Sequence, residues 1–221
     1  MIKTDTRNLY NRRYNLNKIF IHGLGQTDKS WNNVTTELNN INSKCPNLKT
    51  LLGSKDVTFN NLYEAFSQYC DKFSDKIDLC GISLGGMLAL KYTFNNPQKV
   101  NSLVLIGTQY KIPKLLFSLQ GSVFRCLPNS VFGSMGFTKK DFITLTTSMK
   151  NIDFSKDLLN VNCKTLVICG KKDSANMKAS NALHKIIKSS EITLVANSKH
   201  EVNTDAPIQL SKILLKFYNE M

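Results

Sequence analysis

The sequence predicts an α/β fold in which a mostly parallel central sheet is flanked by helices on both faces. Short apolar runs typical of buried strands alternate along the chain with longer segments of helical pattern. The composition, 42% hydrophobic and 20% charged residues, is that of an ordinary globular protein. A length of 221 residues suits one domain with a substantial core, so we expect a single domain over residues 1–221.

The chain begins with polar residues before its first expected strand. Residues 1–17 are expected to form a short edge strand or a loose arm, and residues 18–21 a short strand. A helical segment is expected over 34–38 and a weak strand over 48–52. Apolar residues at spacings of three and four then predict a helix over 57–73, which should cover the sheet before the next strand.

The later strands and helices are expected to alternate regularly. The strands are predicted over 77–80, 100–108, 164–169 and 192–195, and the helices from near Gly85 to 95–97, over 176–187 and from Pro207 onward. Such alternation places the carboxyl ends of the strands, and the loops that follow them, at one edge of the sheet.

Residues 109–160 interrupt this alternation. Their apolar residues are frequent, but proline and glycine divide the segment, which favours short helices with one apolar face. Thr138 is the expected N-cap of a helix that begins at Lys139. On composition alone, these apolar residues are an extension of the hydrophobic core.

The stretch Gly81-Ile82-Ser83-Leu84-Gly85 lies between a predicted strand and a predicted helix. A chain that passes from strand to helix in so few residues must turn sharply, which forces Ser83 into a strained conformation with its Oγ pointing outward. Glycine at both flanks removes Cβ atoms that would collide there. The first N–H groups of the new helix suit a developing negative charge at the same place. The same pentapeptide also occurs in ordinary loops, so its context must decide.

Two further polar residues follow predicted strands at this edge of the sheet. Asp173 comes just after the strand over 164–169, and His200 follows the last strand. A serine hydroxyl becomes a nucleophile when a base takes its proton and a carboxylate orients that base. Ser83, His200 and Asp173 are the three groups that such chemistry needs.

The glycine-flanked serine and the chain order Ser83, Asp173, His200 resemble the α/β-hydrolase superfamily. The resemblance extends from about Lys18 to the C-terminus. It implies that Ser83 is the nucleophile on a nucleophile elbow, and that Asp173 and His200 complete a catalytic triad as acid and base. Lys199 is a departure, because many members of the superfamily have glycine before the histidine.

The loop His22-Gly23-Leu24-Gly25-Gln26 resembles the His-Gly-x-Gly loop of the same superfamily. This resemblance implies that the backbone N–H groups of Leu24 and Leu84 form the oxyanion hole. It also implies that His22 shapes the turn and takes no part in proton transfer. It also implies that the insertion at approximately 109–160 is a lid over the active site.

Alternatives remain for the acid and the base. Asp173 lies in a polar stretch and has the alternative role of a turn residue, in which case Asp153 is the reserve acid, since the acid in this superfamily sometimes moves to another strand end. His184 lies in the middle of a predicted helix and is expected to face solvent, which leaves His200 as the expected base.

The remaining histidines and cysteines predict no metal site and no cofactor, because they are scattered and no Cys-x-x-Cys pair occurs. A disulfide framework is not expected in a chain of this size without a secretion signal. The six cysteines are Cys45, Cys70, Cys80, Cys126, Cys163 and Cys169.

The chain lacks an apolar stretch of about 18 residues, so no membrane span is expected. Residues 1–8 lack the apolar core of a signal peptide, which makes a cytoplasmic location the expectation. The net charge of +13, from 29 basic and 16 acidic residues, suits an anionic partner. No nucleic-acid motif accompanies this charge, so nucleic acid is not an expected partner.

The function expected from these residues is that of a serine esterase, a carboxylesterase or thioesterase that works through an acyl-enzyme on a small-molecule ester. The alternatives are C–C bond hydrolysis or a lyase step on the same triad, and a non-enzymatic binding protein with a hydrolase fold. The substrate and its chain length are not fixed by the sequence, because one fold and triad serve many chemistries.

Lysines beside the expected site suggest an anionic substrate or an acidic acyl carrier as the partner. Their alternative is ordinary solvated surface in a lysine-rich chain. These residues are Lys111, Lys114, Lys139, Lys140, Lys171, Lys172 and Lys199.

Overall fold

The computed structural model describes residues 16–39, 41–112, 128–132 and 136–220. Its centre is a six-stranded sheet with the order β2-β1-β3-β4-β5-β6, and every pairing between neighbouring strands is parallel. The strands are β1 (Asn17–Ile21), β2 (Ser43–Lys44), β3 (Ile77–Ile82), β4 (Val100–Ile106), β5 (Lys164–Gly170) and β6 (Ser190–Val195). The predicted fold class is therefore confirmed, with β2 added as a two-residue edge strand that has no apolar run to reveal it.

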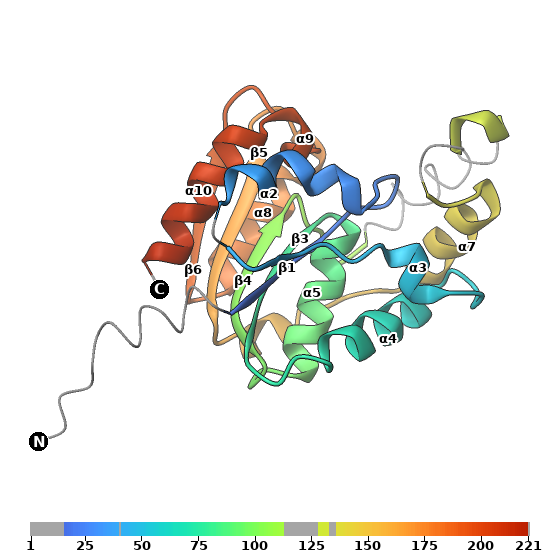
Figure 1. Ribbon diagram of the computed structural model, residues 1–221, viewed down its shortest axis with the longest axis horizontal. Coiled ribbons are helices and arrows are strands. Elements are labelled where there is room, and N and C mark those ends of the chain that lie inside the picture. Colours follow the sequence, from blue (N-terminus) through green and yellow to red (C-terminus); the bar gives the residue numbers. More distant parts are fainter. Residues whose placement is uncertain (1–15, 40, 113–127, 133–135, 221) are drawn as a thin grey trace, which may run out of the picture.

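Helices cover both faces of this sheet (Figure 1). The helices are α2 (Asn32–Glu37), α3 (Leu48–Leu52), α4 (Phe59–Cys70), α5 (Leu84–Asn95), α7 (Lys139–Met149), α8 (Ser174–Ile186), α9 (Val202–Asp205) and α10 (Pro207–Asn219), with 3-10 turns η1 (Asp28–Trp31), η2 (Asn129–Phe132) and η3 (Asp157–Asn160). The predicted boundaries near Pro207 and Lys139 are confirmed, because Pro207 opens α10 and the Thr138 side chain accepts a hydrogen bond from the N–H of Asp141.

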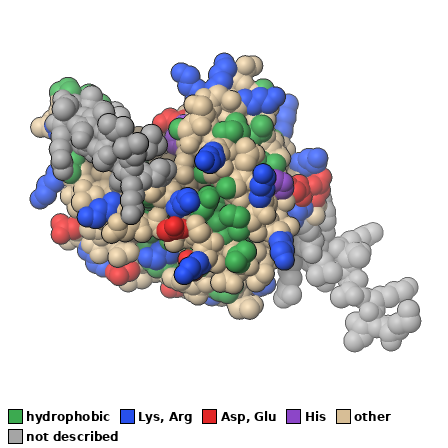
Figure 2. All heavy atoms as spheres, turned by 180° about the vertical axis from the view of Figure 1, so that it is seen from behind, with side chains coloured by type: hydrophobic (Ala, Val, Ile, Leu, Met, Phe, Trp, Pro, Cys, Tyr) green, Lys and Arg blue, Asp and Glu red, His purple; other side chains and the backbone are tan. Residues whose placement is uncertain are grey.

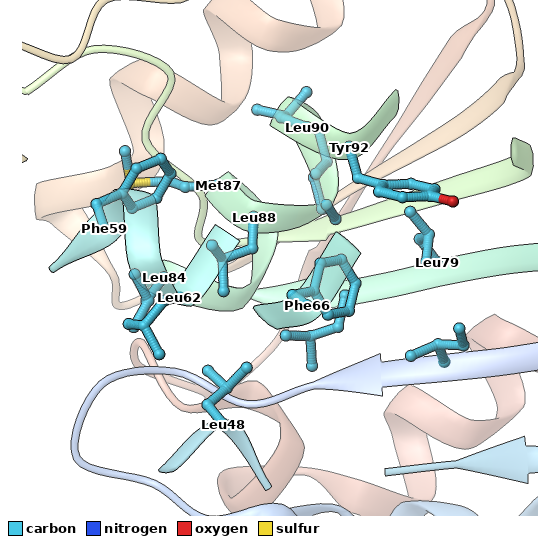
Figure 3. Close-up of a cluster of buried hydrophobic side chains, with 14 of the residues drawn as sticks. Leu48, Phe59, Leu62, Phe66, Leu79, Leu84, Met87, Leu88, Leu90 and Tyr92 are labelled. Atoms are coloured by element: carbon cyan, nitrogen blue, oxygen red, sulfur yellow. The ribbon is translucent and has the colours of Figure 1, made fainter. Parts of the chain in front are cut away.

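The buried apolar side chains form two clusters, one on each face of the sheet. Neighbouring residues of a strand point to opposite faces, so Leu79 of β3 belongs to one cluster and Cys80 to the other. The first cluster is drawn in Figure 3, where Phe66 of α4 and Tyr92 of α5 lie beside Leu79. Residues of α2 and α10 cover Cys80 on the opposite face. Strand β3 thus runs through the middle of the core.

The expectation of a weak strand over 48–52 is wrong, because these residues form helix α3. The side chain of Asn47 caps the start by accepting a hydrogen bond from the N–H of Thr50, and Gly53 ends the helix with a φ of 64°. Leu48 and Leu52 are four residues apart and are both buried on the inner side of the short helix. Capping residues, rather than apolar alternation, decide the structure here.

Helix α4 is shorter than the range predicted for it. It spans Phe59–Cys70 instead of 57–73, because Thr58 caps the start by accepting a hydrogen bond from the N–H of Asn61. The apolar residues at its two predicted ends therefore flank the helix and are not part of it.

A buried ion pair lies at the amino ends of the strands. Lys18 and Asp78 are paired in register on β1 and β3, and Lys18 Nζ lies 3.2 Å from Asp78 Oδ2. The other oxygen, Oδ1, accepts hydrogen bonds of 2.7 Å from Ser102 Oγ and from Asn101 Nδ2, both on β4. Asp78, a polar residue within an apolar strand, is therefore a fully buried carboxylate that faces Lys18 and accepts two hydrogen bonds.

In the described part of segment 109–160, one contact joins the two ends of the segment and another links it to helix α4. An antiparallel bridge joins Lys111 to Asp153 near the two ends of the segment. Helix α7 is linked to α4 by a 2.9 Å hydrogen bond from the N–H of Phe59 to Ser148 Oγ. The short helices η2, α7 and η3 agree with the expected pattern, and the predictions for 113–127 lie outside the described residues.

Candidate active site

Ser83 occupies the turn between β3 and α5 in a strained backbone conformation. Its φ of 54° and ψ of −114° lie in a region that residues with a side chain rarely adopt. A Cβ atom on Gly81 would overlap the backbone of Gly85, and a Cβ atom on Gly85 would overlap the carbonyl of Ile21. Both flanking glycines are therefore required by space, and the turn is as tight as the sequence predicts.

The turn is anchored to the neighbouring strand. The N–H of Ser83 donates a 2.9 Å hydrogen bond to the carbonyl of Ile106, the last residue of β4. A Cβ atom on Gly86 would overlap Thr108 Oγ1, so the first turn of α5 lies directly against the end of the same strand. These contacts hold the strained serine in place.

Asp173 and His200 form a close pair at the carboxyl ends of β5 and β6. His200 Nδ1 lies 2.8 Å from Asp173 Oδ2. The Asp173 side chain is 4% exposed, whereas that of His200 is 39% exposed, so the imidazole faces outward and the carboxylate is nearly buried. Burial raises the pKa of Asp173, but hydrogen bonds from His200 and Asn176 outweigh burial and bring this pKa below its ordinary value.

Gly107 lies where the serine turn meets the Asp173–His200 pair. It follows Ile106, and it has a φ of 51°. A Cβ atom at this position would lie 2.9 Å from His200 Nδ1 and 3.2 Å from Asp173 Oδ2. Ser83 and the Asp173–His200 pair thus lie at the same sheet edge, although no hydrogen bond joins these two described parts of the site.

The loop after β1 lies beside Ser83. A Cβ atom on Gly23 would lie 3.5 Å from the Cβ of Ser83, and the N–H of Gly23 donates to the side-chain oxygen of Gln26 at 3.2 Å. Leu24 follows Gly23 in this loop. Leu84 is the first residue of α5, so its N–H has no carbonyl acceptor within the helix. The two predicted oxyanion residues therefore come from segments that meet at the serine.

His22 has a structural role in this loop. Its ring is buried, with Nε2 accepting a 3.1 Å hydrogen bond from the N–H of Leu48 and Nδ1 lying 2.9 Å from the carbonyl of Gly23. Burial lowers the pKa of His22 despite that carbonyl contact and the charge of Asp28. A neutral imidazole with both nitrogens engaged fixes the start of α3 against the loop.

A buried pair of side-chain amides, Gln26 and Asn203, joins the loop over residues 22–26 to the segment that follows His200. Gln26 Nε2 donates to Asn203 Oδ1 at 3.1 Å, while Asn203 Nδ2 lies 3.3 Å from Gln26 Oε1 and 3.2 Å from the carbonyl of Ser30. Asn203 lies three residues after His200 and is fully buried. Sequence reasoning missed this pair, since its two residues are 177 positions apart.

The other acids and histidines of the prediction lie away from this arrangement. Asp153 is exposed, and its Oδ1 accepts a 2.9 Å hydrogen bond from the N–H of Ser155. His184 lies near the end of α8, half-buried, with its Nδ1 3.1 Å from Ser190 Oγ. Only Asp173, of the two candidate acids, contacts His200.

The described residues contain no group of three or more His, Cys, Asp or Glu that could hold a metal ion. The described cysteines are all unpaired, namely Cys45, Cys70, Cys80, Cys163 and Cys169, and Cys126 lies outside the described residues. Among the helices described here, none is long and apolar enough to cross a membrane.

Comparison with known proteins finds no matching family model and no matching curated protein. Solved structures do match over most of their length. A hydrolase from Pseudomonas aeruginosa superposes with a TM-score of 0.79 at 15% identity, over 91% of this chain and 89% of that chain. The chain has the α/β-hydrolase fold.

Two further solved structures extend this likeness of α/β-hydrolase fold. NosK from Streptomyces actuosus has a TM-score of 0.78 and 18% identity, over 93% of this chain and 98% of that chain. A thermophilic esterase from Thermogutta terrifontis has a TM-score of 0.76 and 17% identity, over 93% and 90%. The expected superfamily resemblance is confirmed at the level of the fold.

Proposed function

We propose that this α/β-hydrolase chain is a serine hydrolase that cleaves a carboxylic ester or thioester through an acyl-enzyme. The observation that carries the proposal is the 2.8 Å contact between His200 Nδ1 and Asp173 Oδ2 at the strand edge that also presents Ser83. The named esterase among the solved structures of this fold is consistent with it.

In the first step His200 takes the proton of Ser83 while the serine oxygen attacks the ester carbonyl. Asp173 accepts the Nδ1–H of His200, which fixes the tautomer and leaves Nε2 to receive that proton. His200 is partly exposed and so is accessible from the side where substrate enters. The strained turn lifts Ser83 out of the sheet toward the base.

The negative charge that develops on the carbonyl oxygen is stabilised by the backbone N–H groups of Leu24 and Leu84. Fixed donors at such a position are worth about 10² to 10³ in turnover each. The intermediate then collapses, and His200 returns the proton to the leaving alcohol or thiol. Water attacks the acyl-enzyme with His200 again as base, which frees the acid product and restores Ser83.

The acyl part of the substrate is proposed to lie under segment 109–160, which serves as the lid. Buried Phe132, Phe137 and Phe142 of this segment belong to the same apolar cluster as Leu84 of the elbow helix. A cavity of about 540 Å³ is lined by Lys49, Asn129, Phe132, Gly136, Phe137, Thr138, Lys139, Lys140 and Asp141. A Cβ atom on Gly136, one of the lining residues, would lie 3.3 Å from Thr27, which follows the loop over residues 22–26.

An anionic substrate or acidic acyl carrier is supported less strongly than ester cleavage itself, and only by the lysines near the site. Lys171, Lys172 and Lys199 are exposed beside the acid and the base, and Lys114 lies outside the described residues. Lys and Arg side chains are also spread over the face seen in Figure 2, rather than gathered in one place. Charge steering weakens as salt rises from 0.1 M to 1 M, so a steered anionic ester loses kcat/KM over that range while a neutral ester does not.

The test of the proposed function is labelling with a fluorophosphonate probe, together with turnover of p-nitrophenyl esters of increasing chain length. The wild-type chain should be labelled and should turn over at least one ester, while Ser83→Ala should abolish labelling and lower turnover by several orders of magnitude. Labelling without ester turnover would favour C–C bond hydrolysis or a lyase step. Absence of both would favour a binding protein.

The expected cytoplasmic location stays a prediction, which fractionation of the source cells tests.

A further inference from the structure

We propose that Asn176 is a positioning residue that holds the carboxylate of Asp173 and, through it, the tautomer of His200. The inference rests on the proposed function, because it assigns a role within the proposed triad. Asn176 lies in the first turn of α8, three residues after the acid, and it is not part of the sequence resemblance.

Asn176 contacts both oxygens of the Asp173 carboxylate. Its side-chain Nδ2 lies 2.9 Å from Oδ1 and 2.9 Å from Oδ2, and its backbone N–H donates to Oδ1 at 3.3 Å. The same Nδ2 lies 3.1 Å from His200 Nδ1. One amide nitrogen therefore lies against both carboxylate oxygens of Asp173 and the imidazole nitrogen paired with them.

The orientation of this amide is set by Gln109. Gln109 Nε2 donates to Asn176 Oδ1 at 2.8 Å and lies 3.4 Å from the carbonyl of Ala175. A reversed Asn176 amide would place its oxygen against the Asp173 carboxylate, where two acceptors meet without a proton. Gln109 thus keeps the donor side of the amide turned toward the acid.

The carboxylate that Asn176 holds in place decides the tautomer of His200. When His200 carries its proton on Nδ1, that proton goes to Oδ2 of a carboxylate that also accepts from the side-chain and backbone N–H groups of Asn176. When the proton is on Nε2 instead, this bond is lost, and the acceptors Nδ1 and Oδ2 face each other at 2.8 Å. The first state is the one that leaves Nε2 able to take the proton of Ser83.

A second effect concerns the charge of the acid. Burial raises the pKa of Asp173, and the hydrogen bonds from His200 and then Asn176 bring it below its ordinary value. The carboxylate is therefore kept ionised in a nearly buried position, where it orients the imidazole.

The experiment compares Asn176→Leu and Asn176→Asp with the wild-type chain. Removing the donors in Asn176→Leu should lower kcat by up to about 10²-fold with KM unchanged, as expected for a misplaced catalytic group. Asn176→Asp should lose more activity than Asn176→Leu, because two adjacent carboxylates resist ionising together. The matched controls are Asn181→Leu and Asn181→Asp, at an exposed position of the same helix.

Asn176→Asp separates positioning from a merely structural role. An acidic residue in the first turn of a helix is favourable to the helix, so a structural role predicts unchanged or raised Tm together with retained kcat. The proposed role predicts that Tm is kept while kcat falls. If Asn176→Leu does not fold, Gln109→Leu provides the second variant, and it should lower kcat less than Asn176→Asp does.

Labelling keeps failure of this inference distinct from failure of the proposed function. If the wild-type chain is neither labelled by the fluorophosphonate nor active on esters, the proposed function is at fault. If the wild type is active and both Asn176 variants keep kcat within twofold of it, the positioning role is overturned. The positioning role would also be overturned if the Asn181 variants lost as much kcat as the Asn176 variants do.

Discussion

Two buried carboxylates lie at opposite ends of the same parallel sheet, and their partners differ in kind. Asp78, near the start of β3, faces the ammonium of Lys18 at 3.2 Å and two neutral donors on β4. Asp173, after the end of β5, faces the imidazole of His200 at 2.8 Å and the amide of Asn176. A lysine carries a full charge, whereas a histidine gains and loses its proton near neutral pH. The first carboxylate thus faces an ammonium within the sheet, and the second faces the imidazole that the proposed function uses as a base.

The supporting structure differs in the same direction. Lys18, Asp78 and Ser102 occupy paired positions on three adjacent strands, so the sheet itself fixes the first carboxylate. Asp173 and His200 lie on loops beyond the strands, where positions must be fixed by additional contacts. Loops carry chemistry because their side chains can reach a substrate, while the strands beneath them supply rigidity.

The sharpest test of this contrast is Asp173→Asn. The substitution keeps the shape of the side chain but presents the wrong tautomer of His200, so turnover should fall by about 10⁴-fold by analogy with other triads. The free energy of unfolding at neutral pH should change far less than activity does. Ester kinetics and chemical denaturation of the same protein sample measure the two effects.

Asp153→Asn is the matched control for the acid. Because the Asp153 side chain is exposed and accepts its described hydrogen bond from Ser155 of its own turn, this substitution should leave kcat/KM within twofold of the wild-type value. If Asp153→Asn lost activity while Asp173→Asn kept it, the acid of the triad would be Asp153 and not Asp173.

The opposite pattern is expected for Asp78→Asn. Loss of the carboxylate that balances a buried ammonium typically costs about 3–5 kcal/mol of stability. Turnover at temperatures below the transition should stay within about twofold, because the site lies at the other end of the sheet. Chemical denaturation and ester kinetics again give both values.

The double variant Lys18→Met with Asp78→Leu sharpens the point. Replacing a buried ion pair by apolar groups of similar volume is often neutral or stabilising, so much of the stability lost in Asp78→Asn should return. A large loss of activity in any of these variants, with the protein still folded, would contradict a purely structural role for the Lys18–Asp78 pair.

Much of the fold and the main residues of the site follow from local sequence signals. Strand β3, the glycine-flanked Ser83 and helix α5 are contiguous, so a few neighbouring residues determine their geometry. The sequence predicts a strand where helix α3 forms, because Asn47 and Gly53, which cap the helix, outweigh the apolar pattern between them. The amide of Asn203 could not be assigned at all, since its partner is brought near only by folding.

The Gln26–Asn203 pair gives a prediction of intermediate size. Asn203→Ala leaves the buried side chain of Gln26 without its partner, which should cost about 1–3 kcal/mol of stability. Because Gln26 also accepts from the N–H of Gly23, the loop over residues 22–26 should loosen. Leu24, the proposed oxyanion donor, lies in this loop, so kcat should fall more than KM rises. A double-mutant cycle of Gln26→Ala and Asn203→Ala measures their coupling, and additive effects on kcat would show that the two amides act separately.

The smallest expected effect is the pH dependence of stability that Asp173 contributes. Hydrogen bonds from His200 and Asn176 overcome burial and lower its pKa in the folded state relative to the unfolded chain. A group with a depressed folded pKa stabilises the protein above its unfolded pKa, near 3.9 for an aspartate, and that contribution is lost as pH falls through the folded pKa. In the acidic range below about pH 5, the stability advantage of the wild type over Asp173→Asn should therefore shrink as the pH falls below about 4. Urea denaturation of both proteins along this series measures the difference, with Asp153→Asn run in parallel. A difference that grows as the pH falls from about 5 to about 3 would mean that Asp173 is held protonated in the folded protein, which would remove it as the carboxylate that orients His200.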